Sequence, residues 1–200
     1  TKRDIELKPG QSATIEDYEV TYVKPTVDRT NQALVFGADL QVNRNGEHFV
    51  HLNPTRQYHQ VTDGRPRGIA SHFDGEATSE VGLKAGMRTD FWTSVEPSTA
   101  EIRRRARIAD QRFATYMREV VQPAIQKDPS RIGPVSDKLA VVQDLATDKI
   151  IEGYKSLDEP VTIRVIVSPM VSWIWVGALI AIFGALFAAW PRRLLNRRKP

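Results

Sequence analysis

The sequence predicts a mixed fold: a small antiparallel β barrel or sandwich with an inserted αα-hairpin, followed by one C-terminal transmembrane helix. Three observations predict it. Short segments that alternate apolar and polar residues, separated by turn residues, fill residues 1–97 and return at 161–167. Residues 98–157 change to the three-and-four spacing that is typical of helices. An uncharged apolar segment, Val171–Trp190, then precedes a basic tail.

The β region, 1–97 plus 161–167, is predicted from alternation and turns. Tyr18, Val20 and Tyr22 alternate with polar residues, which is the pattern of a half-buried strand. Asn45-Gly46 predicts a tight hairpin, because both turn positions of the favoured turn need positive φ. The strands expected on either side of this turn and later in the chain are Ala33–Asn43, Glu47–Leu52, Thr78–Leu83, Asp90–Val95 and Val161–Val167.

The helical hairpin is predicted over residues 98–157. Ser98-x-x-Glu101 after Pro97 has the form of a capping box, and the first helix is expected to break near Pro123. A second helix is expected to end near Ser156. The two helices are expected to pair through apolar faces formed by Ile102, Ala106, Ala109, Phe113, Tyr116 and Val120 in the first and Leu139, Val142, Leu145 and Ile150 in the second.

The transmembrane helix is predicted over residues 170–190. At about 1.5 Å per residue, Val171–Trp190 spans roughly the 30 Å of a bilayer's hydrocarbon core. A buried core helix is the alternative, but it is usually shorter and lacks a flanking charge cluster. Trp173, Trp175 and Trp190 lie near its two ends and are expected to be membrane-interface anchors.

A stripe of small residues follows four-residue steps along the same segment. It suggests close packing against another membrane helix, although alanine and glycine are common in such helices. The stripe consists of Gly177, Ala181, Ala185 and Ala189.

Charge predicts the orientation of this helix. Five Lys and Arg residues follow Trp190, so the tail, 191–200, is expected to be cytoplasmic and residues 1–170 extracytoplasmic at a cytoplasmic (inner) membrane. The sequence opens with Thr-Lys-Arg-Asp and no apolar segment, which suggests the C-terminal piece of a longer membrane protein whose upstream helices would be its partners.

Composition excludes several classes of function. The net charge is +4, and the five charges of the tail leave −1 for residues 1–190, so charge does not favour a nucleic-acid partner. The chain has no cysteine, which excludes disulfides, thiol chemistry and thiolate zinc sites from it.

Several short motifs follow one another along the chain. They are Leu7-Lys-Pro-Gly, Tyr18-x-Val-x-Tyr22, Ala38-Asp-Leu-Gln-Val, Leu52-Asn-Pro-Thr-Arg-Gln-Tyr58, Ser79-Glu-Val-Gly-Leu, Thr89-Asp-Phe-Trp and Val165–Ile180, which contains Trp173-Ile-Trp-Val-Gly. Their order resembles the C-terminal end of the CcmF/NrfE family of cytochrome c maturation proteins, over most of 1–97 and 161–195. The helical hairpin departs from the shorter members of that family.

The resemblance implies a polytopic heme lyase that takes heme from a heme chaperone and attaches it to the reduced thiols of apocytochrome c. Heme is then the cofactor of the full-length parent, and this chain is not expected to ligate it. The family's tryptophan-rich heme-handling segment has no match in this sequence. Whether the chain is part of an enzyme stays open at this point.

The residues alone give no catalytic, cofactor-binding or metal-binding assignment. His48 and His51 are three apart on a predicted strand and are therefore expected to point to opposite faces. His59 and His72 lie in loop sequence, and Asp90 and Glu96 have no nucleophile or base beside them. The run Arg103-Arg-Arg-x-Arg107 suggests either a docking patch or, preferably, a solvated helix face balanced by acidic neighbours.

Two functions from different classes follow. The first is the terminal domain and last membrane helix of a heme lyase, which contributes to heme delivery and attachment. The alternative is a non-enzymatic, membrane-anchored extracytoplasmic module for binding and assembly.

Overall fold

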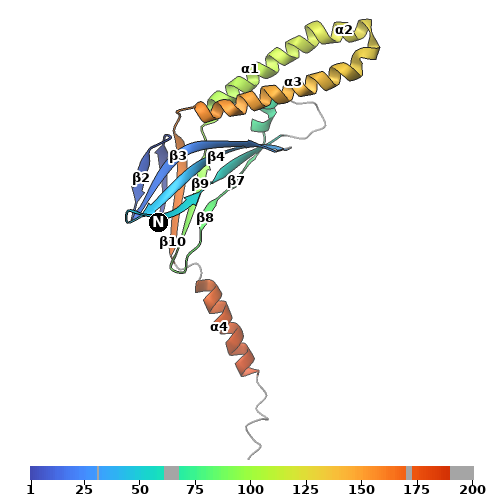
Figure 1. Ribbon diagram of the computed structural model, residues 1–200. Helices are drawn as coiled ribbons and strands as arrows, with labels where there is room; N and C mark the ends of the chain where they lie inside the picture. Colours follow the sequence, from blue (N-terminus) through green and yellow to red (C-terminus); the bar gives the residue numbers. More distant parts are fainter. Residues whose placement is uncertain (31, 61–67, 170–172, 190–200) are drawn as a thin grey trace, which may run out of the picture.

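Two antiparallel sheets make up the β region of the computed structural model, which describes residues 1–30, 32–60, 68–169 and 173–189 (Figure 1). The first sheet has the strand order β1 (Lys2–Leu7), β10 (Val161–Pro169), β9 (Thr89–Glu96) and β8 (Gly82–Lys84). The second has the order β2 (Ser12–Ile15), β3 (Tyr18–Arg29), β4 (Ala33–Arg44), β6 (Thr55–His59) and β7 (Ala77–Glu80), and β5 (Glu47–Leu52) also pairs with β4.

The tight turn predicted at Asn45-Gly46 is confirmed. Asn45 has a φ of 51° and Gly46 a φ of 84°, and the residues around them pair as β4 and β5. Along its other half, β4 pairs with β6 instead. The edge of β4 is therefore shared by two strands, which meet at Asn53-Pro54.

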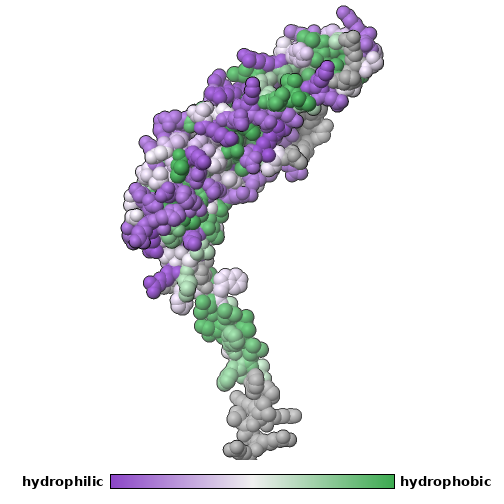
Figure 2. All heavy atoms as spheres, viewed as in Figure 1, coloured by the Kyte–Doolittle hydropathy of each residue, from purple (hydrophilic) through white to green (hydrophobic). Residues whose placement is uncertain are grey.

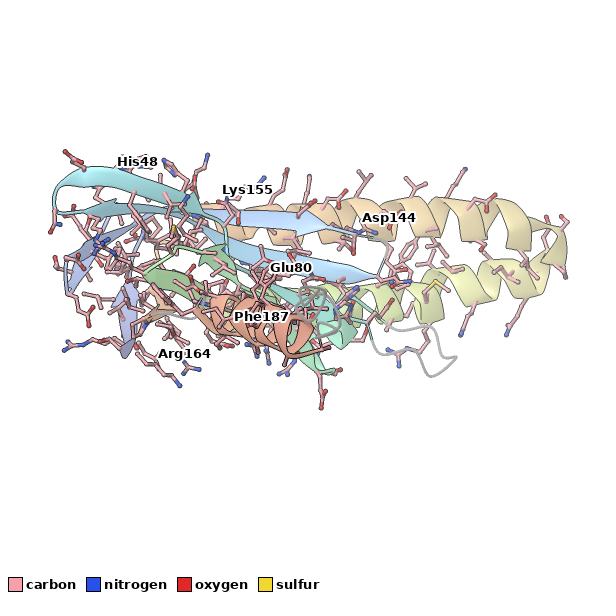
Figure 3. All side chains as sticks on the ribbon, turned by 90° about the horizontal axis from the view of Figure 1, so that it is seen from below. His48, Glu80, Asp144, Lys155, Arg164 and Phe187 are labelled. Carbon is pink, nitrogen blue, oxygen red and sulfur yellow. The ribbon has the colours of Figure 1, made fainter. Side chains whose placement is uncertain are left out.

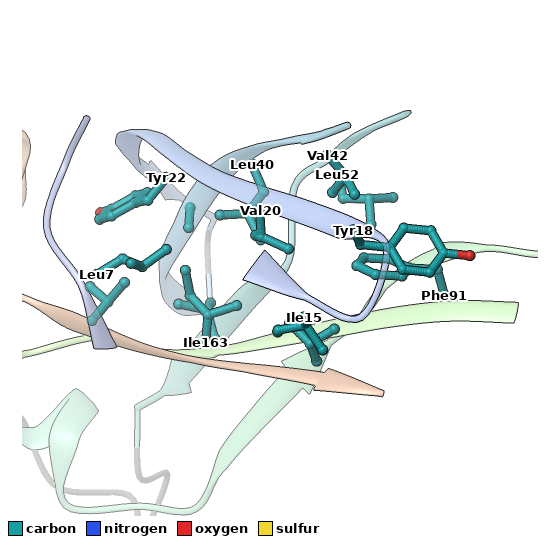
Figure 4. Close-up of a cluster of buried hydrophobic side chains, with 14 of the residues drawn as sticks. Leu7, Ile15, Tyr18, Val20, Tyr22, Leu40, Val42, Leu52, Phe91 and Ile163 are labelled. Carbon is teal, nitrogen blue, oxygen red and sulfur yellow. The ribbon is translucent and has the colours of Figure 1, made fainter. Parts of the chain in front are cut away.

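The core of the β region lies between the two sheets (Figure 4). Alternate residues of the strands face inward, as their sequence pattern predicts, and the aromatic rings of Tyr18 and Phe91 meet with their centres 4.7 Å apart. The largest fully buried members of this core are Ile15, Tyr18, Val20, Tyr22, Leu40, Val42, Phe91, Ile163 and Val165.

A second core joins the β region to the helices. The inward face of β4 carries Ala38, Leu40 and Val42 between the sheets, and the same face continues with Leu34 and Phe36 beneath the helices. One strand face thus supports both cores. The second core also contains Tyr58, Ile69, Phe73, Ile102, Ala106, Ile151 and Tyr154.

The helical region forms an extended antiparallel hairpin that projects from one end of the sheets (Figure 1). Its first arm is α1 (Ala100–Tyr116), a π-helical turn η2 (Met117–Val121) and α2 (Gln122–Lys127). A 3₁₀ turn η3 (Pro129–Arg131) leads into the second arm, α3 (Ile132–Glu152), which ends in the 3₁₀ turn η4 (Gly153–Ser156).

Two details of the predicted first helix are wrong. The helix does not break at Pro123, which falls in the first turn of α2 directly after the wider π turn. The capping box does not form either, because the helix begins at Ala100 and the Ser98 hydroxyl donates a hydrogen bond to Glu159.

The predicted transmembrane helix over residues 170–190 is also wrong. In the described ranges of the chain, no helix is both long and apolar enough to cross a membrane. The apolar helix α4 is described over Trp173–Ala188, which is 16 residues. The packing and anchoring roles expected of Trp173, Trp175, Gly177, Ala181, Ala185 and Ala189 were derived from that span and are not tested by the structure, and Trp190 lies outside the described residues.

The first turn of α1 carries a charge network with a testable pH dependence. Arg104 and Arg105 donate hydrogen bonds of 2.7 and 2.8 Å to the Glu101 carboxylate and lower its pKa to about 2. Because the folded pKa is lowered, this stabilisation is present above the unfolded value of 4.5 and is lost as the pH falls toward 2.

We therefore expect Glu101→Gln to be less stable than the parent chain at neutral pH and to approach it in acid. Urea unfolding of both proteins between pH 7 and pH 2 measures the difference in free energy of unfolding. A difference that stays constant over this range would contradict the proposed ion pairing.

Candidate functional site

An apolar hollow lies between the two arms of the hairpin. We call it the hairpin groove; its volume is about 590 Å³. Three charged or amide side chains lie among its walls, and the rest of the lining is apolar or aromatic. The lining residues are Ile69, Ala109, Asp110, Phe113, Tyr116, Val121, Val135, Lys138, Leu139, Val142, Gln143 and Ala146.

The groove exists because the two apolar helix faces are closed at some points and open at others. Ile102 and Ala106 are fully buried at the base of the hairpin, against the end of the second arm, and Val121 is buried farther out. Tyr116 on the first arm is nevertheless 50% exposed, and Val142 on the second arm is 55% exposed. The apolar faces were expected to pair, and at these exposed positions the expectation is wrong. Figure 2 shows hydrophobic residues on the surface of the hairpin.

The inner end of the groove is fixed by Asp110. Its two carboxylate oxygens accept hydrogen bonds from the backbone N–H groups of Ile69, at 2.8 Å, and Ala70, at 2.9 Å. These residues begin the 3₁₀ helix η1 (Ile69–Phe73). A Cβ atom on Gly68 would lie 2.2 Å from Asp110 Cγ, so only glycine allows this approach. The carboxylate thus holds η1 against α1.

The second arm is fastened to the tip of β3. Arg29 forms ion pairs with Asp144, at 2.5 Å, and with Asp148, at 3.0 Å. Figure 3 shows Asp144 on α3 beside the end of the long strands. Farther along this arm, Tyr154 packs its ring against Phe36 with ring centres 4.9 Å apart, and burial raises the pKa of its hydroxyl. The base of the hairpin is therefore held by ion pairs and by aromatic packing.

The arginine run of α1 divides into different roles. Arg104 and Arg105 bind Glu101, as the expectation of a balanced, solvated face requires. Arg103 instead turns inward and stacks its guanidinium over Tyr58, at 5.8 Å, and Phe73, at 5.3 Å. Arg103 therefore stabilises the second core, and the four arginines of the run do not form one shared positive patch.

The histidines of β5 lie closer together than the sequence predicts. His48 pairs with Asn43 and His51 pairs with Gln41, with a β-bulge between them at Phe49. Directly opposed residues share a face, so the bulge puts both histidines on the outer face of the sheet. Their ring centres are 5.0 Å apart. The expectation that they point to opposite faces is wrong.

The remaining candidate polar residues are engaged in local contacts. His59 Nε2 lies 3.0 Å from the Thr78 hydroxyl. His72 Nδ1 lies 3.1 Å from the carbonyl oxygen of Ile69, and burial lowers its pKa. Asp90 accepts a hydrogen bond from the backbone of Gly86, and Glu96 pairs with Arg56 at 2.7 Å. Asp90 and Glu96 therefore do not form an acid pair.

Two positions of the apolar helix α4 have contrasting surroundings. Trp173 lines a hollow of about 490 Å³ at the end of the sheets, together with Tyr18, Phe49 and Met87. At Gly177, an added Cβ atom would have no neighbour within 4 Å among the described residues. Figure 2 shows the hydrophobic surface of α4.

Comparisons with known proteins add no identification. No family model, no curated protein and no solved structure matches this chain. Within the part of the chain that the structure describes, no group of three or more histidine and acidic residues is arranged to hold a metal ion. The hairpin groove is thus the feature that best supports a function.

Proposed function

We propose that this chain is a non-enzymatic module for binding and assembly, and that the hairpin groove receives an amphipathic helix of a partner protein. The observation that carries the proposal is the groove itself: two antiparallel helices held apart, with apolar side chains exposed between them. Burying such a surface is favourable at about 25 cal/mol per Å² of apolar area.

A helix fits the groove better than other occupants. The part of α3 that lines it, from Val135 to Ala146, covers about three helical turns. Two helices with an apolar groove between them form a bundle when a third helix inserts its apolar face. Lys138 and Gln143 lie among the lining residues and offer polar contacts to the flanks of the incoming helix. The contacts at the base of the hairpin already fix where the two arms begin, which lowers the entropic cost of binding.

The setting of this binding follows from the motif resemblance described above. We propose cytochrome c maturation, with apocytochrome c as the partner whose helix enters the groove and with the heme chaperone acting in the same assembly. In this proposal the chain presents apocytochrome c to heme held elsewhere and attaches nothing itself.

Two neighbouring valines of α3 provide a matched test. Val142 lines the groove and is 55% exposed, whereas Val141 is 58% exposed and does not line it. We expect Val142→Asp to weaken the binding of fluorescently labelled apocytochrome c at least about tenfold, or about 1.4 kcal/mol, and Val141→Asp to leave it unchanged. Fluorescence anisotropy measures both, and unchanged urea midpoints show that both variants are folded.

Equal effects of the two substitutions, or no binding by the parent chain, would overturn the proposal. Hemin titration followed at the Soret band is the second arm of the experiment. A saturable hemin complex that Val142→Asp abolishes would assign the groove to the porphyrin itself and not to a helix.

A further inference from the structure

The outer face of the second sheet carries two histidines whose rings lie at the spacing of two ligands of one metal ion. In a tetrahedral site each metal–nitrogen bond is about 2.0–2.1 Å, so two coordinating imidazole rings have centres roughly 5 Å apart. The rings of His48 and His51 are 5.0 Å apart and are inclined by 41°. The bulge at Phe49 produces this placement, since in a regular strand the two side chains would be on opposite faces.

The bulge is held in place from the inside of the molecule. Phe49 packs partly buried against the first core, with its ring centre 5.4 Å from that of Tyr18 and 6.2 Å from that of Phe91. The extra residue is therefore anchored by aromatic contacts, and the positions of the two histidines are fixed by the fold. Figure 3 shows His48 at the outer side of its strand.

An acidic neighbour lies beside one of the two rings. Asp39 Oδ1 lies 3.7 Å from His51 Nδ1, which is beyond hydrogen-bonding distance, and the Asp39 side chain is largely buried. A carboxylate on the Nδ1 side of the ring leaves the other nitrogen, Nε2, for a metal ion. Polar residues continue around this face: Gln41 donates a hydrogen bond to Asn43, which donates one to Glu19.

We propose that His48 and His51 bind one divalent transition metal ion, with water completing its coordination and Asp39 acting as a positioning residue. Imidazole ligands suit copper, nickel and zinc, and affinity rises from nickel to copper and falls again at zinc. Cu²⁺ is therefore expected to bind more tightly than Zn²⁺. This site is separate from the hairpin groove and does not depend on the function proposed for it.

Titration with Cu²⁺ tests the site. We expect isothermal titration calorimetry to show one saturable Cu²⁺ site with a dissociation constant in the micromolar range, and electron paramagnetic resonance to show nitrogen ligands. His48→Ala and His51→Ala should each weaken binding at least about tenfold, and Asp39→Asn should weaken it without abolishing it. Zn²⁺ should bind the same site more weakly.

His59→Ala is the matched control, because His59 lies on the next strand along the chain, β6, and contacts Thr78. This substitution should leave the Cu²⁺ affinity unchanged. The proposal is overturned if the parent chain shows no saturable site below millimolar Cu²⁺. It is equally overturned if binding survives in both His48→Ala and His51→Ala, or if His59→Ala weakens it as much as they do.

Discussion

Replacing Phe36 with alanine is expected to destabilise the whole chain by about 3–5 kcal/mol. Phe36 is fully buried on β4, and its ring contacts those of Tyr58, Phe73 and Tyr154, with centres 4.9 to 6.0 Å away. These partners come from a strand, from η1 and from the end of the second hairpin arm, which cannot all move inward to fill the cavity. Equilibrium unfolding in urea measures the loss.

Val35→Ala is the control for this substitution. Val35 precedes Phe36 on the same strand but faces the other side and is only partly buried. Its truncation is expected to cost about 1 kcal/mol or less. If the two substitutions lower the free energy of unfolding equally, the packing of Phe36 does not stabilise the second core. The contact between the helices and the sheet would then have been assigned to the wrong residues.

Gly37→Ala is expected to have the second largest effect, through crowding. An added Cβ atom would lie 2.6 Å from Thr26 Oγ1 and 2.8 Å from the carbonyl oxygen of Pro54. That carbonyl accepts a hydrogen bond from Ala38 at the point where β4 changes partner from β5 to β6, so it cannot move without breaking the sheet. Overpacking of this kind costs about 1–3 kcal/mol or more.

Gly133→Ala is the control for this substitution. Gly133 lies in the first turn of α3, and apart from its chain neighbours an added Cβ atom would have no neighbour within 4 Å among the described residues. Alanine is the better helix former, but Gly133 precedes Pro134, and a residue with a Cβ atom is disfavoured in helical conformation before a proline. The two effects oppose each other, so the urea midpoint should fall for Gly37→Ala and stay near that of the parent chain for Gly133→Ala. A stabilised Gly37→Ala chain would refute the crowding argument.

The strands and the paired helices follow from local pattern, but the site does not. Alternation over Tyr18–Tyr22 and the Asn45-Gly46 turn identify their elements, because side-chain period and turn chemistry act over a few residues. No local sequence pattern shows that Tyr116 and Val142 stay exposed, because an apolar helix face has the same sequence whether or not the facing helix covers it. The groove depends on where Arg29 and Asp110 hold the two arms.

The bulge at Phe49 left a signal in the sequence. Two consecutive apolar residues, Phe49 and Val50, interrupt the alternation between His48 and His51, and this interruption is a usable signal for a bulge.

The continuous inward face of β4 decides how separable the hairpin is. The arms are inserted between β9 and β10, whose residues Glu96 and Thr162 lie directly opposite each other, so a short turn could in principle join the strands without them. Excision would nevertheless strip the cover from Leu34 and Phe36 and leave that half of the sheet with an apolar surface facing water. In the order of the strands the hairpin is an insertion, but its burial of Leu34 and Phe36 makes it an integral part of the domain. A shortened version of this protein must therefore keep it.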